Sequence, residues 1–301
     1  MPERLFVCVV GGINADISGT PHEALLPHDS NPGRVKVTPG GVGRNIAENL
    51  VRLGVSTALV TVTGDDANGA WLRTSCDAIG IDLSGAATLT SVPTGTYLCL
   101  NQRDGDILAA ISDMQACDAI TPDFVAARMQ LLNRADAVVV DANLPADTVR
   151  YLAAHCRAPL AADPVSVRKA GRLGSLLHRL CLIKPNLREA AALTGEAQAQ
   201  DAARVLLEAG VGRAMITLGE KGVWFADAKD RGLMPCAAGP VVNTNGCGDA
   251  FFSASLRATL EGADVRESAR LGQAAAAICA ACESAVNPAL TWSMVRQTAK
   301  I

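Results

Sequence analysis

Short apolar runs recur along the chain and leave room for a helix between most of them. Each run is rich in Val, Ile, Leu or Ala and bounded by turn-forming residues, a pattern typical of strands buried on both faces. The runs are Phe6–Val10, Thr57–Val62, Ala137–Val140, Leu160–Ala162, Cys181–Ile183 and Ala214–Thr217. This alternation predicts an α/β fold, in which helices cover both faces of a mainly parallel sheet.

Two segments interrupt the alternation. Ile17–Thr38 is rich in Pro, Gly and His, and Pro93–Met114 holds two strand-like stretches on either side of Arg103-Asp104-Gly105-Asp106. Because Asp-Gly favours the tight turn of a β-hairpin, the second segment predicts a hairpin. We expect the two segments to form a small β lid over the sheet, within a single domain spanning residues 1–301.

Length and charge limit the classes of function. A chain of 301 residues with 49% hydrophobic residues can bury a large core. The apolar stretch Leu5–Ile13 is too short for a membrane span and lacks a basic leader, so we expect a cytoplasmic protein without a membrane partner. The 27 Lys and Arg nearly balance 30 Asp and Glu, so we expect no nucleic-acid partner.

The ten cysteines are scattered, and without an export signal we predict reduced thiols. Their one close pair is Cys279-Ala-Ala-Cys282, in a stretch that we predict to be an Ala-rich helix. A metal site would need further Cys or His ligands, so we interpret the pair as small core residues.

The strongest candidate chemistry lies in Val241–Ala258, where a glycine-bearing turn leads into a helix-forming stretch. Free backbone N–H groups at a helix start bind anions, and the glycines in Gly246-Cys247-Gly248 let the backbone approach phosphate oxygens. Asp249 can accept the proton of an attacking hydroxyl beside that turn. The alternative is an ordinary Asp-capped helix after a glycine turn.

The segment N-T-N-G-C-G-D-A-F at 243–251 resembles the D-T-x-G-A-G-D-A-F motif of ribokinase-like (PfkB) kinases. Four more segments resemble that family in the same order: V-G-G-I-N-A-D at 10–16, G-G-V-G-R-N-I-A at 40–47, K-P-N-L-R-E at 184–189 and T-L-G-E-K-G-V at 217–223. Five ordered motifs are far more specific than one glycine motif. The resemblance implies a three-layer αβα fold with a β lid, and an ATP-dependent kinase.

The resemblance also implies roles for individual residues. Asp249 would be the catalytic base, beside the turn Gly246, Cys247 and Gly248. The acceptor substrate would contact Asn14, Asp16, Gly40, Gly41, Val42 and Asn45. ATP would contact Asn186, Thr217, Gly219, Gly222, Gly246 and Gly248.

Glu189 lies three residues after Asn186, so on a helix the two side chains share one face. They could organise hydrated Mg²⁺ beside the phosphates of ATP, with Glu189 acting through water, or form only a solvated helix start. No G-x-x-x-x-G-K-[ST] occurs in the sequence, so an anion cradle other than a P-loop is required.

Some positions depart from related patterns. Asn243 stands where many relatives carry an Asp that helps to form a monovalent-cation site, so a potassium requirement stays open. Cys247 replaces the family's Ala. Gly41-Val42-Gly43 begins a dinucleotide-binding pattern, but Ile46 occupies its third glycine position, which disfavours a nicotinamide-dependent oxidoreductase.

Within the family, four segments most resemble pseudouridine kinases: Asp29–Gly33, Thr38–Ala47, Ile111–Met114 and Asp163–Ser166. This implies ATP-dependent phosphorylation of the pseudouridine 5′-hydroxyl, with the lid over the base. The alternatives are a kinase for another nucleoside or a free sugar (ribose, fructose or a 2-keto sugar acid), or a catalytically silent nucleoside-binding protein. Family members often dimerise through the lid, so the resemblance also implies a homodimer.

Overall fold

The computed structural model describes residues 5–103, 107–237 and 239–301. Its centre is an eight-stranded sheet in the order β14-β13-β12-β11-β10-β9-β1-β4. The pairings from β4 to β12 are parallel, and β13 and β14 extend the sheet antiparallel. The strands are β1 Phe6–Val10, β4 Ser56–Val60, β9 Ala137–Asp141, β10 Leu160–Asp163, β11 Leu180–Ile183, β12 Arg213–Thr217, β13 Val223–Asp227 and β14 Arg231–Met234.

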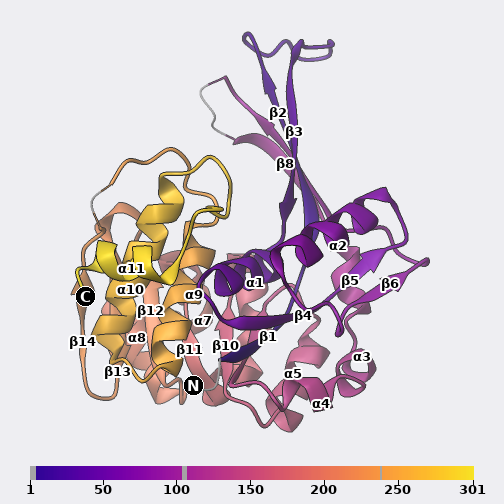
Figure 1. Ribbon diagram of the computed structural model, residues 1–301. Coiled ribbons are helices and arrows are strands. Elements are labelled where there is room, and N and C mark those ends of the chain that lie inside the picture. The colour runs from indigo at the N-terminus through magenta and orange to yellow at the C-terminus, as the bar shows by residue number, and fades with distance from the viewer. Residues whose placement is uncertain (1–4, 104–106, 238) are drawn as a thin grey trace.

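Helices cover both faces of this sheet, because its strands bury side chains on both sides (Figure 1). In β1, for example, Val7 and Val9 pack in one core cluster while Cys8 and Val10 pack in the other. The first face carries α1 Val42–Arg52, α2 Ala67–Ile79, α9 Cys247–Leu260 and α10 Val265–Ala280. The second carries α3 Pro122–Ala126, α4 Met129–Leu132, α5 Ala146–His155, α7 Leu187–Thr194, α8 Ala199–Glu208 and the 3-10 helix η2 Gly171–Arg179. The predicted αβα architecture is confirmed.

The remaining short elements connect these layers or lie at their edges. They are α6 Val167–Ala170, α11 Trp292–Ala299, the 3-10 helices η1 Gln115–Ala119 and η3 Gly219–Lys221, and the paired strands β5 Val62–Gly64 and β6 Ala87–Leu89.

A four-stranded lid rises away from the αβα body (Figure 1). Its order is β3-β2-β7-β8, so strands from two distant parts of the chain pair side by side. The turn expected at 104–106 lies outside the described residues. The lid strands are β2 Asn14–Pro21, β3 Gly33–Gly40, β7 Thr96–Asn101 and β8 Ile107–Asp113.

The structure corrects two expectations from the sequence and adds two strands. The single strand expected at Thr57–Val62 is divided at Thr61, because the chain there leaves the main sheet to pair with β6. The antiparallel strands β13 and β14 were not predicted. Cys282 lies beyond the end of α10, where its thiol contacts the Ser284 hydroxyl.

Cys279 is buried in the core, as predicted, and the ten cysteines are free thiols. Within the described ranges, no helix combines the length and apolar character that a membrane crossing requires.

Candidate active site

The candidate acceptor residues lie where the lid joins the main sheet. β1 ends at Val10 and β2 begins at Asn14, so Asn14 and Asp16 follow the carboxyl end of a parallel strand, where open sheets bind ligands. Asn14 Nδ2 donates to Asp16 Oδ1 at 2.5 Å. Burial raises the pKa of Asp16, and the Asn14 hydrogen bond and the nearby Arg44 charge oppose that rise.

Two glycines let β3 and α1 approach these residues. A side chain on Gly40 would collide with the Asp16 carboxyl group. Gly41 has φ of 99°, and a Cβ there would lie 2.5 Å from the Gly12 carbonyl oxygen, so only glycine fits. Val42 then opens α1 and brings Asn45 into its first turns.

Asp249 lies in the first turn of α9 and is only 8% exposed. Asn45 Nδ2 donates to Asp249 Oδ2 at 3.0 Å, although 204 residues separate the two in the chain. The structure therefore brings the predicted base and one predicted acceptor residue into direct contact. The sulfur of Cys247, at the start of the same helix, lies 3.7 Å from the Asn243 carbonyl oxygen.

Burial raises the pKa of Asp249 to about 7, and the negative charges of Asp163 and Asp141 act in the same direction. The Asn45 hydrogen bond and the positive charge of Lys184 oppose them. A carboxylate with such a pKa binds a proton readily near neutral pH, which is the property required of a general base.

The turn before α9 is shaped by contacts that exclude side chains. Gly246 has φ of 77°, and a Cβ there would collide with the Ala285 carbonyl oxygen. A Cβ on Gly248 would lie 3.0 Å from Lys184 Nζ, so a buried ammonium lies directly beside this turn. N–H groups at a helix start and a neighbouring ammonium together form a suitable anion cradle.

Lys184 is held in that place by Asp163, whose Oδ2 lies 3.1 Å from Lys184 Nζ. Burial alone would lower the pKa of Lys184, but Asp163, Asp249 and Glu189 outweigh burial and raise it. Lys184 is therefore charged beside the cradle.

A second buried carboxylate connects the loops that carry the acceptor residues. Asp141 Oδ2 accepts from the backbone N–H groups of Gly12 at 2.8 Å and Gly43 at 3.0 Å, and Oδ1 accepts from Asn143 N–H at 2.8 Å. It thereby fixes the end of β1 against the start of α1. Burial raises the pKa of Asp141, and its hydrogen bonds oppose that rise.

Asn186 and Glu189 form the capping box of α7. Asn186 Oδ1 accepts from Glu189 N–H at 2.9 Å, and Glu189 Oε2 accepts from Asn186 N–H at 2.8 Å. Asn186 also pairs in a β-bridge with Thr217 at the end of β12. The hydrogen bonds of a helix start are thus present, but Glu189 is buried and not solvated, and its second carboxylate oxygen, Oε1, lies outside the box.

Gly219 and Gly222 shape the connection from β12 to β13. Leu218 N–H donates to the Gly222 carbonyl at 2.8 Å, and Gly222 N–H donates to the Gly219 carbonyl at 3.0 Å. Gly222 has φ of 100°, and a side chain there would collide with the Met234 carbonyl oxygen. Thr217 N–H donates to the Pro185 carbonyl at 2.9 Å, beside the Asn186–Thr217 bridge, and so links this connection to the K-P-N segment.

The residues fit a nucleotide phosphate with its magnesium ion. Side chains at positions 246 and 248 would meet the Ala285 carbonyl oxygen and Lys184 Nζ, so the turn keeps its shape only with glycines, and the buried Lys184 ammonium supplies positive charge beside it. Among the residues that the structure describes, no three His, Cys, Asp or Glu side chains are grouped to hold a metal ion. Any magnesium bound here would thus depend partly on phosphate and water oxygens.

Comparison with known proteins agrees with this geometry. The family model described as pfkB family carbohydrate kinase matches residues 4–292. The chain belongs to this family. Its fold and its class as a ribokinase-like kinase are therefore as predicted, and such kinases are ATP-dependent.

The pseudouridine kinase of Escherichia coli strain K12 is 33% identical over 97% of this chain and 95% of its own length. A second protein of that strain, named uncharacterized sugar kinase YeiI, is also 33% identical, over 97% of this chain and 82% of its own. The solved structure of a carbohydrate kinase from Agrobacterium tumefaciens is 31% identical, with a TM-score of 0.88 over 98% of this chain and 97% of its own.

The sequence reasoning missed three charged residues of this site as functional residues. Asp141 and Asp163 end strands β9 and β10, and Lys184 follows β11, so all three lie at the carboxyl edge of the sheet. The sequence pattern could have identified them, because charged residues directly after buried parallel strands mark the ligand-binding edge of the sheet.

Proposed function

We propose that this kinase phosphorylates the 5′-hydroxyl of pseudouridine, with ATP as donor, to give pseudouridine 5′-phosphate and ADP. The proposal rests on the contact between Asn45 and Asp249, which joins the acceptor segment to the base. The E. coli relative named pseudouridine kinase supports the choice of substrate. We also propose that the protein acts in the cytoplasm, where ATP is available.

In this mechanism Asp249 accepts the proton of the acceptor hydroxyl as that oxygen attacks the terminal phosphoryl group. The Gly246–Gly248 turn and Lys184 lie beside Asp249 and offset the negative charge that develops in transfer. The low solvent exposure of Asp249 limits competing proton exchange with water.

The residues that would orient the acceptor lie where the lid joins the main sheet. Asp16 and Asn14 offer a carboxylate and an amide to vicinal hydroxyls of the sugar. Strand pairing places Tyr97 and Ser112 in one row with Asp16 across the lid, so their side chains share its face. These hydroxyl groups are suitable partners for a nucleobase edge.

Asn186, Thr217, Gly219 and Gly222 would line the remainder of the ATP site, and Glu189 would hold Mg²⁺ through water. Magnesium would neutralise phosphate charge there. The loop before α9 disfavours a potassium site at Asn243, because both ends of the Asn243 amide already form hydrogen bonds. Its Oδ1 accepts from Asn245 N–H at 2.9 Å, and its Nδ2 donates to the Glu283 carbonyl at 2.8 Å.

A substrate panel tests this proposal. Among pseudouridine, uridine, adenosine, ribose, fructose and a 2-keto sugar acid, we expect pseudouridine to give the highest kcat/KM and the 5′-monophosphate as product. ADP release and mass spectrometry of the product measure both. The 33% identity to YeiI makes a free sugar the second candidate. A higher kcat/KM for that sugar would replace the substrate but leave the kinase chemistry in place, and no turnover with any acceptor would favour a silent binding protein.

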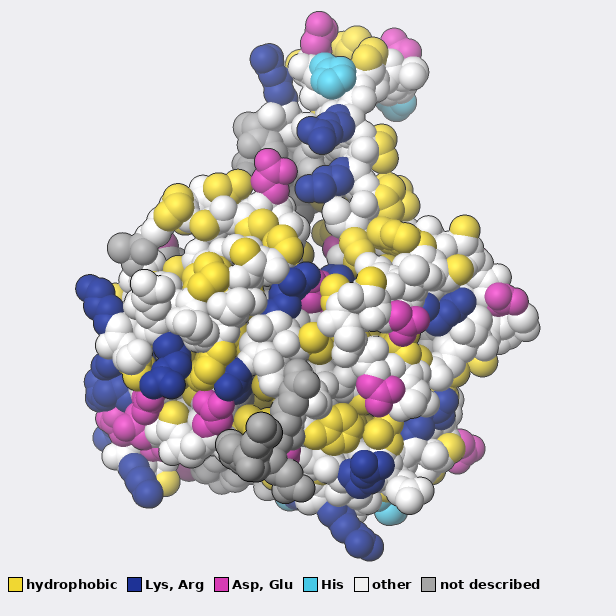
Figure 2. All heavy atoms as spheres, in the orientation of Figure 1, with side chains coloured by type: hydrophobic (Ala, Val, Ile, Leu, Met, Phe, Trp, Pro, Cys, Tyr) yellow, Lys and Arg dark blue, Asp and Glu magenta, His cyan; other side chains and the backbone are white. Residues whose placement is uncertain are grey.

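We further propose that two copies associate through the lid. Val37, Ile17, Leu98 and Ile111 are directly paired across the four lid strands and face away from Asp16. Val37 is 49%, Leu98 46% and Ile111 67% exposed, and Figure 2 shows hydrophobic side chains gathered along the lid. Such a row favours burial against a second copy.

Light scattering tests this association, and we expect the mass of two chains. The variant Leu98→Asp should have the mass of one chain, because a charge in a buried apolar interface is strongly unfavourable. Leu233→Asp, at a residue of β14 that is 54% exposed, is the control and should remain a dimer. A monomeric wild type, or a dimeric Leu98→Asp variant, would contradict the proposal.

A further inference from the structure

The hydrogen bond from Asn45 to Asp249 depends on which end of the Asn45 amide faces the carboxylate. The oxygen and nitrogen ends of an amide have nearly the same shape, so packing alone does not choose between them. In the structure Nδ2 donates to Asp249 Oδ2 at 3.0 Å, and Oδ1 accepts from Arg44 Nη1 at 3.2 Å. Because a guanidinium only donates and a carboxylate only accepts, these two neighbours permit a single amide orientation.

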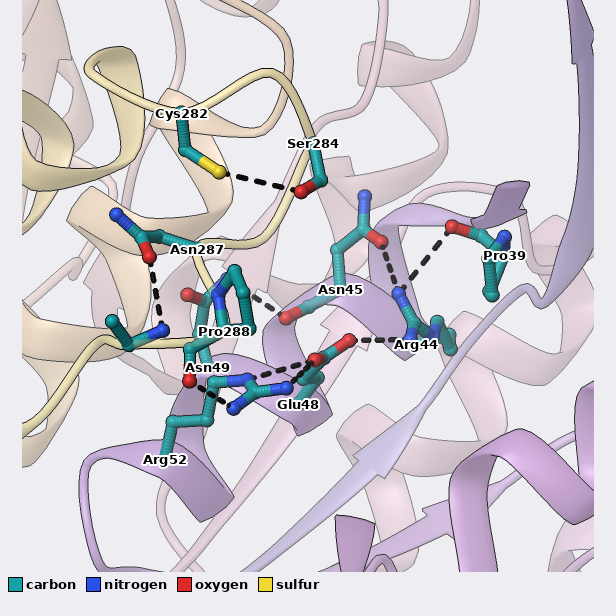
Figure 3. Close-up of polar contacts among 11 residues, drawn as sticks. Pro39, Arg44, Asn45, Glu48, Asn49, Arg52, Cys282, Ser284, Asn287 and Pro288 are labelled. Carbon is teal, nitrogen blue, oxygen red and sulfur yellow. Dashed lines mark hydrogen bonds and ion pairs between the residues drawn. The ribbon is translucent and has the colours of Figure 1, made fainter. Parts of the chain in front are cut away.

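Arg44 is itself held by a charged array on one face of α1. It forms an ion pair with Glu48, one turn along the helix, and Nη1 also donates to the Pro39 carbonyl at 3.4 Å. Arg52 binds Glu48 Oε1 through Nε at 2.8 Å and through Nη2 at 2.6 Å. Arg52 Nη1 in turn donates to the Pro288 carbonyl at 2.5 Å (Figure 3).

Within this array, the pair of Arg44 and Glu48 is more deeply buried than an ordinary pair of helix charges. The side chains of Arg44 and Glu48 are each 6% exposed, whereas those of the comparable pair Arg257 and Glu261 on α9 are 16% and 38% exposed. Buried ion pairs add little stability compared with apolar residues of similar size. The position of Arg44, against the partner of the catalytic base, therefore points to a role other than stability.

We propose that Arg44 is a positioning residue, which fixes the Asn45 amide so that its Nδ2 group stays on Asp249 and keeps that carboxylate in the basic form. This inference rests on the proposed role of Asp249 as the base. The acceptor hydroxyl would thus meet an oriented and ionised carboxylate. Without Arg44 the amide could turn, and its oxygen would then repel the carboxylate.

Other charges face the same groups. Asp249 is surrounded by Asp141 and Asp163 from the ends of β9 and β10 and by Lys184 after β11. Arg44 faces Glu48 on its own helix, Asp16 on β2 and the Cys76 thiol on α2. A test must therefore keep the charge of Arg44 and change only the geometry of its donors.

Arg44→Lys meets this requirement. The ammonium keeps a positive charge opposite Glu48 but lacks the planar fork needed to bind Glu48 and Asn45 together. We expect kcat/KM for the acceptor, at saturating MgATP, to fall about fivefold at pH 7. The midpoint of its rise with pH should move upward by about one unit, because the carboxylate loses a hydrogen bond that favours its charged form. The loss should largely disappear at high pH.

Two comparisons separate positioning from general damage. Arg257→Lys, the same substitution in the exposed pair on α9, should leave the midpoint unchanged. In an Asn45→Ala background the midpoint is already raised. Arg44→Lys should add no further shift there, because the amide that connects Arg44 to Asp249 is absent. Glu48→Gln, which loosens Arg44 without removing it, should shift the midpoint less and in the same direction.

An unshifted midpoint in a folded Arg44→Lys protein would overturn the proposal, and so would a shift that persists in the Asn45→Ala background. An effect on acceptor KM alone would also contradict the proposal, because it would mean that Arg44 acts on acceptor binding through Asp16. Every assay uses the acceptor that the wild type phosphorylates best, so a preference other than pseudouridine changes the proposed substrate and not this result. If Asp249→Asn retained the same pH midpoint, the assigned base would be wrong, which is a separate failure.

Discussion

Replacing Asp249 with asparagine is expected to lower kcat by about 10²- to 10⁴-fold, since the amide keeps the shape of the carboxylate but cannot accept a proton as a base. Binding of ATP, measured by calorimetry, should change little. Asp249 faces Asn45 and not the solvent, so its loss should leave the surface of the protein as it is.

The same substitution should raise stability above neutral pH. The pKa of Asp249 is about 7 in the folded chain and about 3.9 in an unfolded one, so the folded state binds the proton more tightly. Between these values the wild-type free energy of unfolding must therefore fall as pH rises. Asp249→Asn removes this loss, and its melting temperature at pH 8 should exceed that of the wild type by several degrees.

Asp264→Asn is the matched control. Asp264 caps the next helix, α10, where its side chain accepts from Glu267 N–H at 2.7 Å. Asparagine caps helices nearly as well as aspartate, so this variant should keep both kcat and stability. If Asp249→Asn behaved like Asp264→Asn, with activity within a few-fold of the wild type, Asp249 would be only a helix-start residue.

Gly246→Ala is the second substitution with a large expected effect. Residue 246 has φ of 77°, and its Cβ would collide with the Ala285 carbonyl oxygen, so the turn must move. We expect kcat to fall by at least about 10²-fold, because the displaced turn no longer directs its N–H groups at the phosphoryl group. We also expect the free energy of unfolding to fall by about 2–4 kcal/mol, as measured by urea denaturation.

Gly262→Ala separates the collision from backbone strain. Gly262 also has a positive φ, of 88°, but nothing lies within 4 Å of the position of its Cβ. It should lose only about 1 kcal/mol of stability, the ordinary penalty for a side chain in this conformation, and retain full activity. Equal effects of the two alanine variants would mean that the Ala285 contact does not hold the cradle.

The sequence alone was sufficient for the αβα architecture around the central parallel strands, and it supplied the prediction of a catalytic base beside a glycine turn. Strands β1, β9, β10, β11 and β12 are apolar runs buried on both faces, so their hydrophobic residues are continuous and easily recognised. The glycine turn and Asp249 were equally visible, because a helix start with glycines has the same anion-binding chemistry wherever it occurs.

Tertiary structure decided the edges of the sheet and the surroundings of the base. Strand β14 alternates exposed and half-buried residues and so lacks an apolar run, whereas β13 has one in Val223–Ala226, and only the fold shows that it pairs antiparallel at this edge. The pKa of Asp249 depends on Asn45, Asp163 and Lys184, which come from three other parts of the chain. Local sequence patterns report the chemistry of each segment, whereas burial and charge interactions arise only once distant segments are packed together.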